Sequence, residues 1–169
     1  MSLSMYESSI PVLIRNLNNL SAFLEKGANH ASEKEIDDAV FLNSRLFPDM
    51  FPLARQIQIA SDVSKGAAAR LSGIEAPNFE DNEASFEELQ TRISNTIKFL
   101  ESVPADQIDG TEEKEITVPA GANEFKFSGR DFLQTFVLPN VFFHTTTAYN
   151  ILRHNGVEIG KMDFLGAPK

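Results

Sequence analysis

The sequence has 169 residues, of which 42% are apolar and 23% charged, so it is long enough to bury the core of one domain. Its net charge of -9 makes binding to nucleic-acid phosphates or to an anionic membrane surface unexpected, and no run of three Lys or Arg offers a local basic patch. The absence of cysteine excludes disulfides, thiolate nucleophiles, zinc–thiolate sites and iron–sulfur clusters from these residues.

The first predicted helix covers residues 6–26. Its apolar residues recur at spacings of three and four and therefore share one face: Tyr6, Ile10, Leu13, Leu17, Leu20 and Leu24. Gly27 is expected to end this helix and to open a loop in which His30 is exposed. Ser32 and Glu35 then form a capping-box pattern for a short segment.

The second predicted long helix begins at Pro52 and runs to Leu71, after a connector at 41–49 that has at most one helical turn. Gly73 is expected to end it. Its apolar stripe consists of Leu53, Ile57, Ala60, Val63, Ala67 and Leu71.

A third helix is predicted from the cap residue Ser85, paired with Glu88, to about Ser102. Apolar and polar residues alternate in 115–119 and again in 124–127, which predicts a β-hairpin with the four-residue loop 120–123. The acidic loop at 76–82 lies before the third helix.

The last predicted helix runs from Gly129 to Asn155, with Ser128 as its cap and a kink at Pro139. Gly156 is suited to the position after its end. The tail from Val157 lacks periodicity, but its Phe164-Leu165 pair predicts packing against the body or against a partner.

These elements predict a mainly all-α fold, a four-helix bundle with a small β-hairpin before the last helix, in one domain of residues 1–169. The connections after the first and third helices are long enough to serve as crossovers. Residues 1–7 do not read as a signal peptide, and no apolar stretch is long enough to span a bilayer, so a cytoplasmic location is expected.

Polar residues on the inward helix faces mark the candidate site. With a rotation of about 100° per residue, His144 falls at the centre of the apolar face of the last helix, and Asn140 lies one turn earlier. Gln56 faces inward on the second long helix, whereas Gln58 is expected to face water. Tyr6 of the first helix is able to approach the set, which makes Gln56, Asn140, His144 and Tyr6 the ligand-binding candidates.

The stretch from His144 to Gly156 resembles the final helix of the DinB/YfiT-like superfamily, in which a metal-binding His precedes a Leu-Arg pair and a closing Gly. Three further segments are similar to an uncharacterised family within it: Leu46-Phe-Pro-Asp-Met50, Ala69-Arg-Leu-Ser-Gly73 and Gly160-Lys-Met-Asp-Phe-Leu-Gly166. The resemblance covers nearly the whole chain.

The resemblance implies a four-helix bundle whose metal-binding members hold one divalent metal ion with three His, one from the second helix and two from the fourth. Only His144 matches this set. Asn140 and Gln56 stand at the other two positions, and amide oxygens bind divalent first-row metal ions far more weakly than imidazole does.

Three interpretations of His144 are open: a core histidine hydrogen-bonded to its neighbours, a contact to a small ligand, or a metal ligand. His154 is expected to complement the helix C-terminal dipole, and the carboxylate pairs, such as Glu80-Asp81, to be solvated.

The corresponding functions are a bundle that binds a small molecule without the three-His metal site, a divalent-metal enzyme resembling the thiol-dependent transferases, and an interaction module. The interaction module is expected to form a homodimer in which Met162, Phe164 and Leu165 are buried at the partner.

Overall fold

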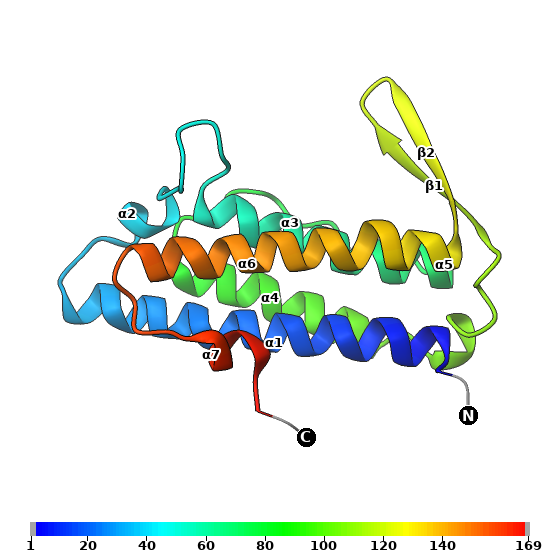
Figure 1. Ribbon diagram of the computed structural model, residues 1–169, viewed down its shortest axis with the longest axis horizontal. Coiled ribbons are helices and arrows are strands. Elements are labelled where there is room, and N and C mark those ends of the chain that lie inside the picture. Colours follow the sequence, from blue (N-terminus) through cyan, green and yellow to red (C-terminus); the bar gives the residue numbers. More distant parts are fainter. Residues whose placement is uncertain (1–2, 168–169) are drawn as a thin grey trace.

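Four long helices and a β-hairpin make up the computed structural model, which describes residues 3–167 (Figure 1). The long helices are α1 (Met5–Glu33), α3 (Leu53–Ser72), α4 (Phe86–Glu101) and α6 (Leu138–His154). The shorter elements are α2 (Asp38–Leu42), the 3-10 turn η1 (Ala105–Gln107), α5 (Gly129–Asp131), the π-helical segment η2 (Phe132–Val137) and α7 (Lys161–Leu165). The fold is therefore the mainly helical bundle that the sequence predicts.

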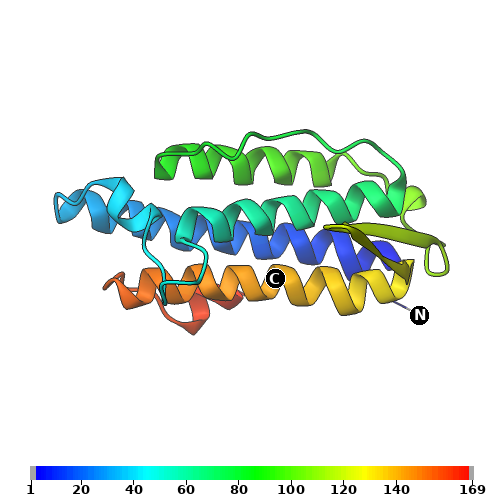
Figure 2. The same cartoon turned by 90° about the horizontal axis from the view of Figure 1, so that it is seen from above.

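Helices α1 and α6 begin at the end of the bundle that carries the hairpin, whereas α3 and α4 begin at the opposite end (Figure 1). The connection between α3 and α4, residues 73–85, must therefore run along the length of the bundle, as Figure 2 shows. The prediction of crossovers after the first and third long helices is wrong, because both of those connections join helix ends that lie at one end of the bundle.

Helix α1 is longer than its sequence predicts and continues through Gly27 to Glu33, so Ser32 is not a cap and His30 is not in a loop. The reason is the close packing at Gly27. A Cβ atom there would lie 2.9 Å from Leu152 Cδ2 and 3.3 Å from Phe86 Cε1. The glycine allows α4 and α6 to approach this turn instead of ending the helix.

The β-hairpin pairs β1 (Glu115–Ala120) with β2 (Asn123–Ser128) in antiparallel register, with Ala120 opposite Asn123. The loop therefore contains two residues rather than the predicted four, and Gly121 takes a positive φ of 63° that suits a tight turn. The hairpin projects from the bundle (Figure 1). Phe127 anchors it, because its ring lies 6.1 Å from that of Phe132, which is buried.

The predicted last helix is divided just before Pro139, where η2 widens the helix for one turn and α6 then begins. Proline lacks an amide proton and its ring clashes with the carbonyl of the preceding turn, so a wider turn there accommodates it. The prolines and glycines that end the other elements act as expected, and Gly73 takes the left-handed conformation after α3 with a φ of 87°.

The core consists of the apolar stripes that the sequence predicts. Ile10, Leu13, Leu17, Leu20 and Leu24 of α1 are fully buried, as are Leu53, Ile57, Ala60, Ala67 and Leu71 of α3. The tail folds back onto the body, where the ring of Phe164 packs edge-on against Tyr149. Within residues 3–167, no helix combines the length and apolar character that crossing a bilayer requires.

Candidate functional site

His144 and Gln56 meet where α6 packs along α3. Gln56 is in the first turns of α3 and is 2% exposed, and His144 is in the middle of α6 and 9% exposed. Their side chains are hydrogen-bonded, with 2.7 Å between His144 Nδ1 and Gln56 Oε1. The structure thus brings together two of the four residues that the sequence singles out, and these two residues are 88 positions apart in the chain.

The Gln56 amide determines which nitrogen of His144 carries the proton. Gln56 Nε2 donates to the backbone carbonyl of Phe51 at 2.9 Å, so the amide oxygen must face the imidazole. An oxygen there accepts, and Nδ1 therefore donates. A neutral His144 with its proton on Nδ1 has a free lone pair on Nε2, which is the nitrogen available to accept a proton or a hydrogen bond.

Burial lowers the pKa of His144 below the usual value for histidine, and the nearby positive charge of Arg55 lowers it further. The imidazole is therefore neutral at pH 7, and the tautomer assignment above applies to its main state. Because the folded-state pKa is the lower one, the unfolded chain takes up the proton first. The difference between the two pKa values of His144 contributes to the stability of the folded chain. This contribution is present above the ordinary histidine pKa and is lost as the pH falls through the lowered value.

Nε2 of His144 keeps some exposure to solvent although the residue as a whole is buried. Within residues 3–167 this nitrogen has no hydrogen-bond partner, and it is not among the side-chain atoms that are enclosed without one. Phe143 lies beside the imidazole, edge-on at 5.2 Å, and is 59% exposed. Phe51, which is 55% exposed, lies under the guanidinium of Arg55 at 5.9 Å. A polar acceptor thus stands beside the exposed ring of Phe143.

Asn140 and Tyr6 do not join this pair. Asn140 is half-buried one turn before His144, and no hydrogen bond connects it with His144 or Gln56. Tyr6 is in the first turn of α1, at the hairpin end of the bundle, where its backbone amide donates to Asp109. Gln56 lies in the first turn of α3, at the other end of the bundle (Figure 1). The expectation that Tyr6 approaches Gln56 and His144 is therefore wrong.

The residues around His144 do not fit a three-imidazole metal site. Gln56 of α3 stands at the position where the metal-binding members have the histidine of their second helix. Its amide oxygen accepts a hydrogen bond from Nδ1 of His144, so Gln56 acts as the partner of the histidine. The donor set is then one imidazole nitrogen with neighbouring amides. Within residues 3–167, no three His, Cys, Asp or Glu side chains converge as metal coordination requires.

The sequence analysis missed a charged network that is centred on Arg92. Arg92 of α4, whose side chain is 1% exposed, binds Asp62 at 2.7 Å, Asp81 at 3.0 Å and Glu83 at 2.7 Å. Burial alone would lower the pKa of Arg92, but its hydrogen bond to Glu83 and the charges of Asp62 and Glu83 outweigh burial and raise the pKa. The network fixes the 73–85 crossover onto α3 and α4.

The same crossover explains one error of the sequence analysis. Gln58, expected to face water, is 6% exposed because the crossover covers it, and its Nε2 donates to Glu83 at 2.8 Å. Asp81 is exposed, as expected, with its side chain 42% accessible, and it also pairs with both Arg55 and Arg92. Arg55 pairs with Asp81 and its charge lowers the pKa of His144, so it connects the network to the environment of His144. The signal for this connection in the sequence was a basic residue directly before Gln56.

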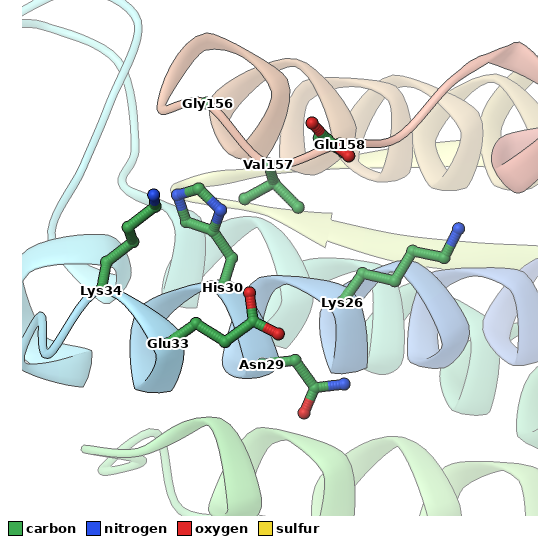
Figure 3. Close-up of a pocket in the computed structure, with 8 residues that line it drawn as sticks. All are labelled: Lys26, Asn29, His30, Glu33, Lys34, Gly156, Val157 and Glu158. Carbon is green, nitrogen blue, oxygen red and sulfur yellow. The ribbon is translucent and has the colours of Figure 1, made fainter.

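His30 lines a different cavity, of about 490 Å³, at the ends of α1 and α6 (Figure 3). Figure 3 shows its imidazole between Lys34 and Val157. Lys26, on the same wall, is already paired with Asp163 at 2.6 Å. Lysine and glutamate side chains alternate around this cavity, so it has no single charge preference. His154 is exposed in the last turn of α6, as expected from its position near the helix end.

Comparisons with known proteins agree with this architecture. The family model described as "Domain of unknown function (DUF1993)" matches residues 5–165. A solved structure described as a DinB family member protein from Shewanella denitrificans is 39% identical, with a TM-score of 0.90 over 96% of this chain and 92% of that one. A search of curated proteins found no match. The chain is therefore a member of the DUF1993 family, with a DinB-like four-helix bundle.

Proposed function

We propose that the chain is a binding protein for a small organic molecule that donates a hydrogen bond to His144 Nε2. One observation carries this proposal: the imidazole is held by Gln56 through Nδ1, while Nε2 keeps its lone pair on the solvent side. The buried amide satisfies Nδ1 as any buried imidazole requires, and it thereby leaves Nε2 as the acceptor. The exposed ring of Phe143, which lies edge-on beside the imidazole, suits an aromatic or otherwise flat ligand.

The donor set argues against the alternative of a divalent-metal enzyme. Nε2 of His144 is the one imidazole nitrogen that remains free. The three-His pattern requires further imidazole or carboxylate ligands for the same metal ion, and no such group of ligands exists within residues 3–167. Metal-dependent transferase chemistry therefore plays no part in the proposed function. Binding is also proposed without an enclosed chamber, since His144 is 9% exposed and does not line the five main cavities of residues 3–167.

Phenol and anisole provide the test, because they share a ring and differ in the hydroxyl donor. We expect phenol to move the His144 Nε2 resonance of histidine-labelled protein and anisole to leave it in place. His144→Phe should weaken phenol binding by about tenfold, the value of one good hydrogen bond. His154→Phe, on the exposed end of the same helix, is the control. Equal responses to both probes would contradict the proposal.

The binding should also depend on pH in a defined direction. Only the neutral imidazole has the free lone pair, and burial beside Arg55 lowers its pKa. Phenol binding should therefore persist as the pH falls through the ordinary histidine value, about 6.5, and disappear only through the lowered pKa. Loss of binding at the ordinary value would show that the imidazole is not in the environment described above.

We propose, as an alternative to ligand binding at His144, that the same end of the bundle forms a homodimer, since a partner that covered Phe143 would also cover the imidazole beside it. Phe47 is 63% exposed on the connection that projects near α2, and Phe51 and Phe143 are also more than half exposed. Light scattering at micromolar concentration should give the mass of two chains, and Phe47→Ser with Phe143→Ser should give the mass of one. Phe125→Ser, on the hairpin, is the matched control. A monomer mass for the unmodified protein would refute the dimer.

A further inference from the structure

We infer that the chain has a second ligand site, formed by α1, α6 and α7, which takes a small organic acid with an apolar body. The site is a cavity of about 410 Å³ that side chains of all three helices line. Cavities of about 300–1,000 Å³ are typical of sites for small molecules. His144 does not line this cavity, so the inference does not rest on the function proposed for His144.

Arg15 determines the charge of the ligand. It is the one charged side chain in the lining, so the cavity has a single positive charge and no acidic group. Within residues 3–167 its guanidinium pairs with no carboxylate. One carboxylate matches this charge, whereas a doubly charged phosphate group would keep one charge uncompensated beside apolar walls. The cavity therefore favours a singly charged acid.

The guanidinium of Arg15 is held in place by one nitrogen and has two others to offer. Nη2 donates to the carbonyls of Leu165 and Ala167, each at 2.9 Å, and these bonds fix its position beside α7. Nη1 and Nε donate to no atom within residues 3–167. A carboxylate can accept a charge-assisted hydrogen bond from either of these two nitrogens.

Thr146 provides a neutral donor at the same cavity. The hydroxyls of its neighbours on α6, Thr145 and Thr147, donate to carbonyls one turn earlier in the helix, each at 2.8 Å. The hydroxyl of Thr146 has no such partner within residues 3–167, and the residue is exposed. Its O–H group is therefore available to an oxygen of the ligand.

The apolar walls determine the body of the ligand. Phe142 of α6 and Leu165 of α7 are 39% and 44% exposed, and Phe164 lines the cavity between α7 and α1. Asn19 Nδ2 donates to the carbonyl of Phe164 at 2.9 Å, which helps to hold α7 against α1 (Figure 1). An aromatic or short aliphatic body fits these walls, because covering them removes apolar surface from water.

Hydrocinnamate and its uncharged amide, hydrocinnamamide, test this inference, because they share a body and differ in charge. In amide-resolved NMR titrations of the full chain, both should shift the signals of Phe164 and Leu165. Hydrocinnamate should bind about fivefold more tightly, the value of one partly exposed ion pair. Salt at about 0.5 M should reduce this preference, since it screens such a pair. Acetate, which lacks the apolar body, should shift neither signal at the same concentrations.

Variants separate the charge of Arg15 from its hold on α7. Arg15→Gln removes the charge, so it should bind the two probes with equal affinity. Asn19→Ala loses the hydrogen bond to α7 but keeps the charge, so it should retain the preference for the acid. Arg70→Gln, at an exposed arginine of α3, should also retain it. Thr146→Trp should fill the cavity and abolish binding of both probes.

Three results would each overturn the inference. The first is equal affinity of the unmodified protein for hydrocinnamate and hydrocinnamamide, and the second is no binding of hydrocinnamate at millimolar concentrations. The third is a preference for the acid that survives in Arg15→Gln or disappears equally in Asn19→Ala, because Arg15 would then act only by holding α7.

Discussion

Replacing Arg92 with alanine should lower the free energy of unfolding by about 3–5 kcal/mol, because it leaves carboxylates in a buried network without their cation. Glu83 is the most buried of them, with a side chain 8% exposed, and Asp62 and Asp81 share the same guanidinium. The Arg92 side chain also packs against the ring of Phe79 at 5.5 Å. Urea unfolding followed by circular dichroism measures the change.

Two further variants make the Arg92 prediction specific. Adding Glu83→Gln to Arg92→Ala should recover part of the lost stability, since it removes the most buried uncompensated charge. Arg70→Ala is the control, because Arg70 is exposed on α3 and bonds only the carbonyl of Gly66 in its own helix. It should change the free energy of unfolding by less than about 0.5 kcal/mol. A loss for Arg92→Ala as small as that would show that the network does not stabilise the crossover.

Phe132→Ala should have a comparable effect, a loss of about 3–5 kcal/mol, because it empties a fully buried aromatic position. The Phe132 ring stacks on Phe136 at 5.8 Å and meets Phe127 of the hairpin at 6.1 Å. Hydrogen exchange should therefore become faster throughout β1 and β2 as well, since the hairpin loses its main anchor.

The hairpin itself supplies the control for Phe132. Phe125 is 53% exposed on the same hairpin, so Phe125→Ala should change the free energy of unfolding by less than about 0.5 kcal/mol. Unfolding curves of the two variants in the same denaturant decide the matter. Equal losses would mean that packing of the exposed hairpin face, rather than burial of Phe132, determines stability.

Helical periodicity carried most of the information about the fold. The stripes of α1 and α3 identified core residues individually, and the facing of Gln56 and His144 followed from the rotation per residue alone. Periodicity is local, however, and this limits what it predicts. It cannot determine which face of a helix another segment will cover, and the 73–85 crossover buries Gln58 on a face that looks solvent-directed in the sequence.

The remaining errors also concern contacts between distant segments. Gly27 looks like a helix end until the approach of Leu152 and Phe86 is known, because that contact gives the glycine a packing role. The orientation of the Gln56 amide depends on the Phe51 carbonyl, a backbone group that leaves no trace in the residue pattern. Tyr6 was misplaced because a helical wheel gives direction around an axis but not position along the bundle.

The π-helical turn at Phe132–Val137 has a consequence for how the chain tolerates insertions and deletions. A π turn is equivalent to one residue added to an α-helix, so it holds a one-residue surplus between the hairpin and α6. Removing one residue there would relax the turn to regular α-helix and leave the facing of His144 relative to the hairpin nearly unchanged, because the wider turn already absorbs the rotation of the extra residue. The hairpin and the His144 site should therefore keep their relative orientation whether or not the chain carries this extra residue.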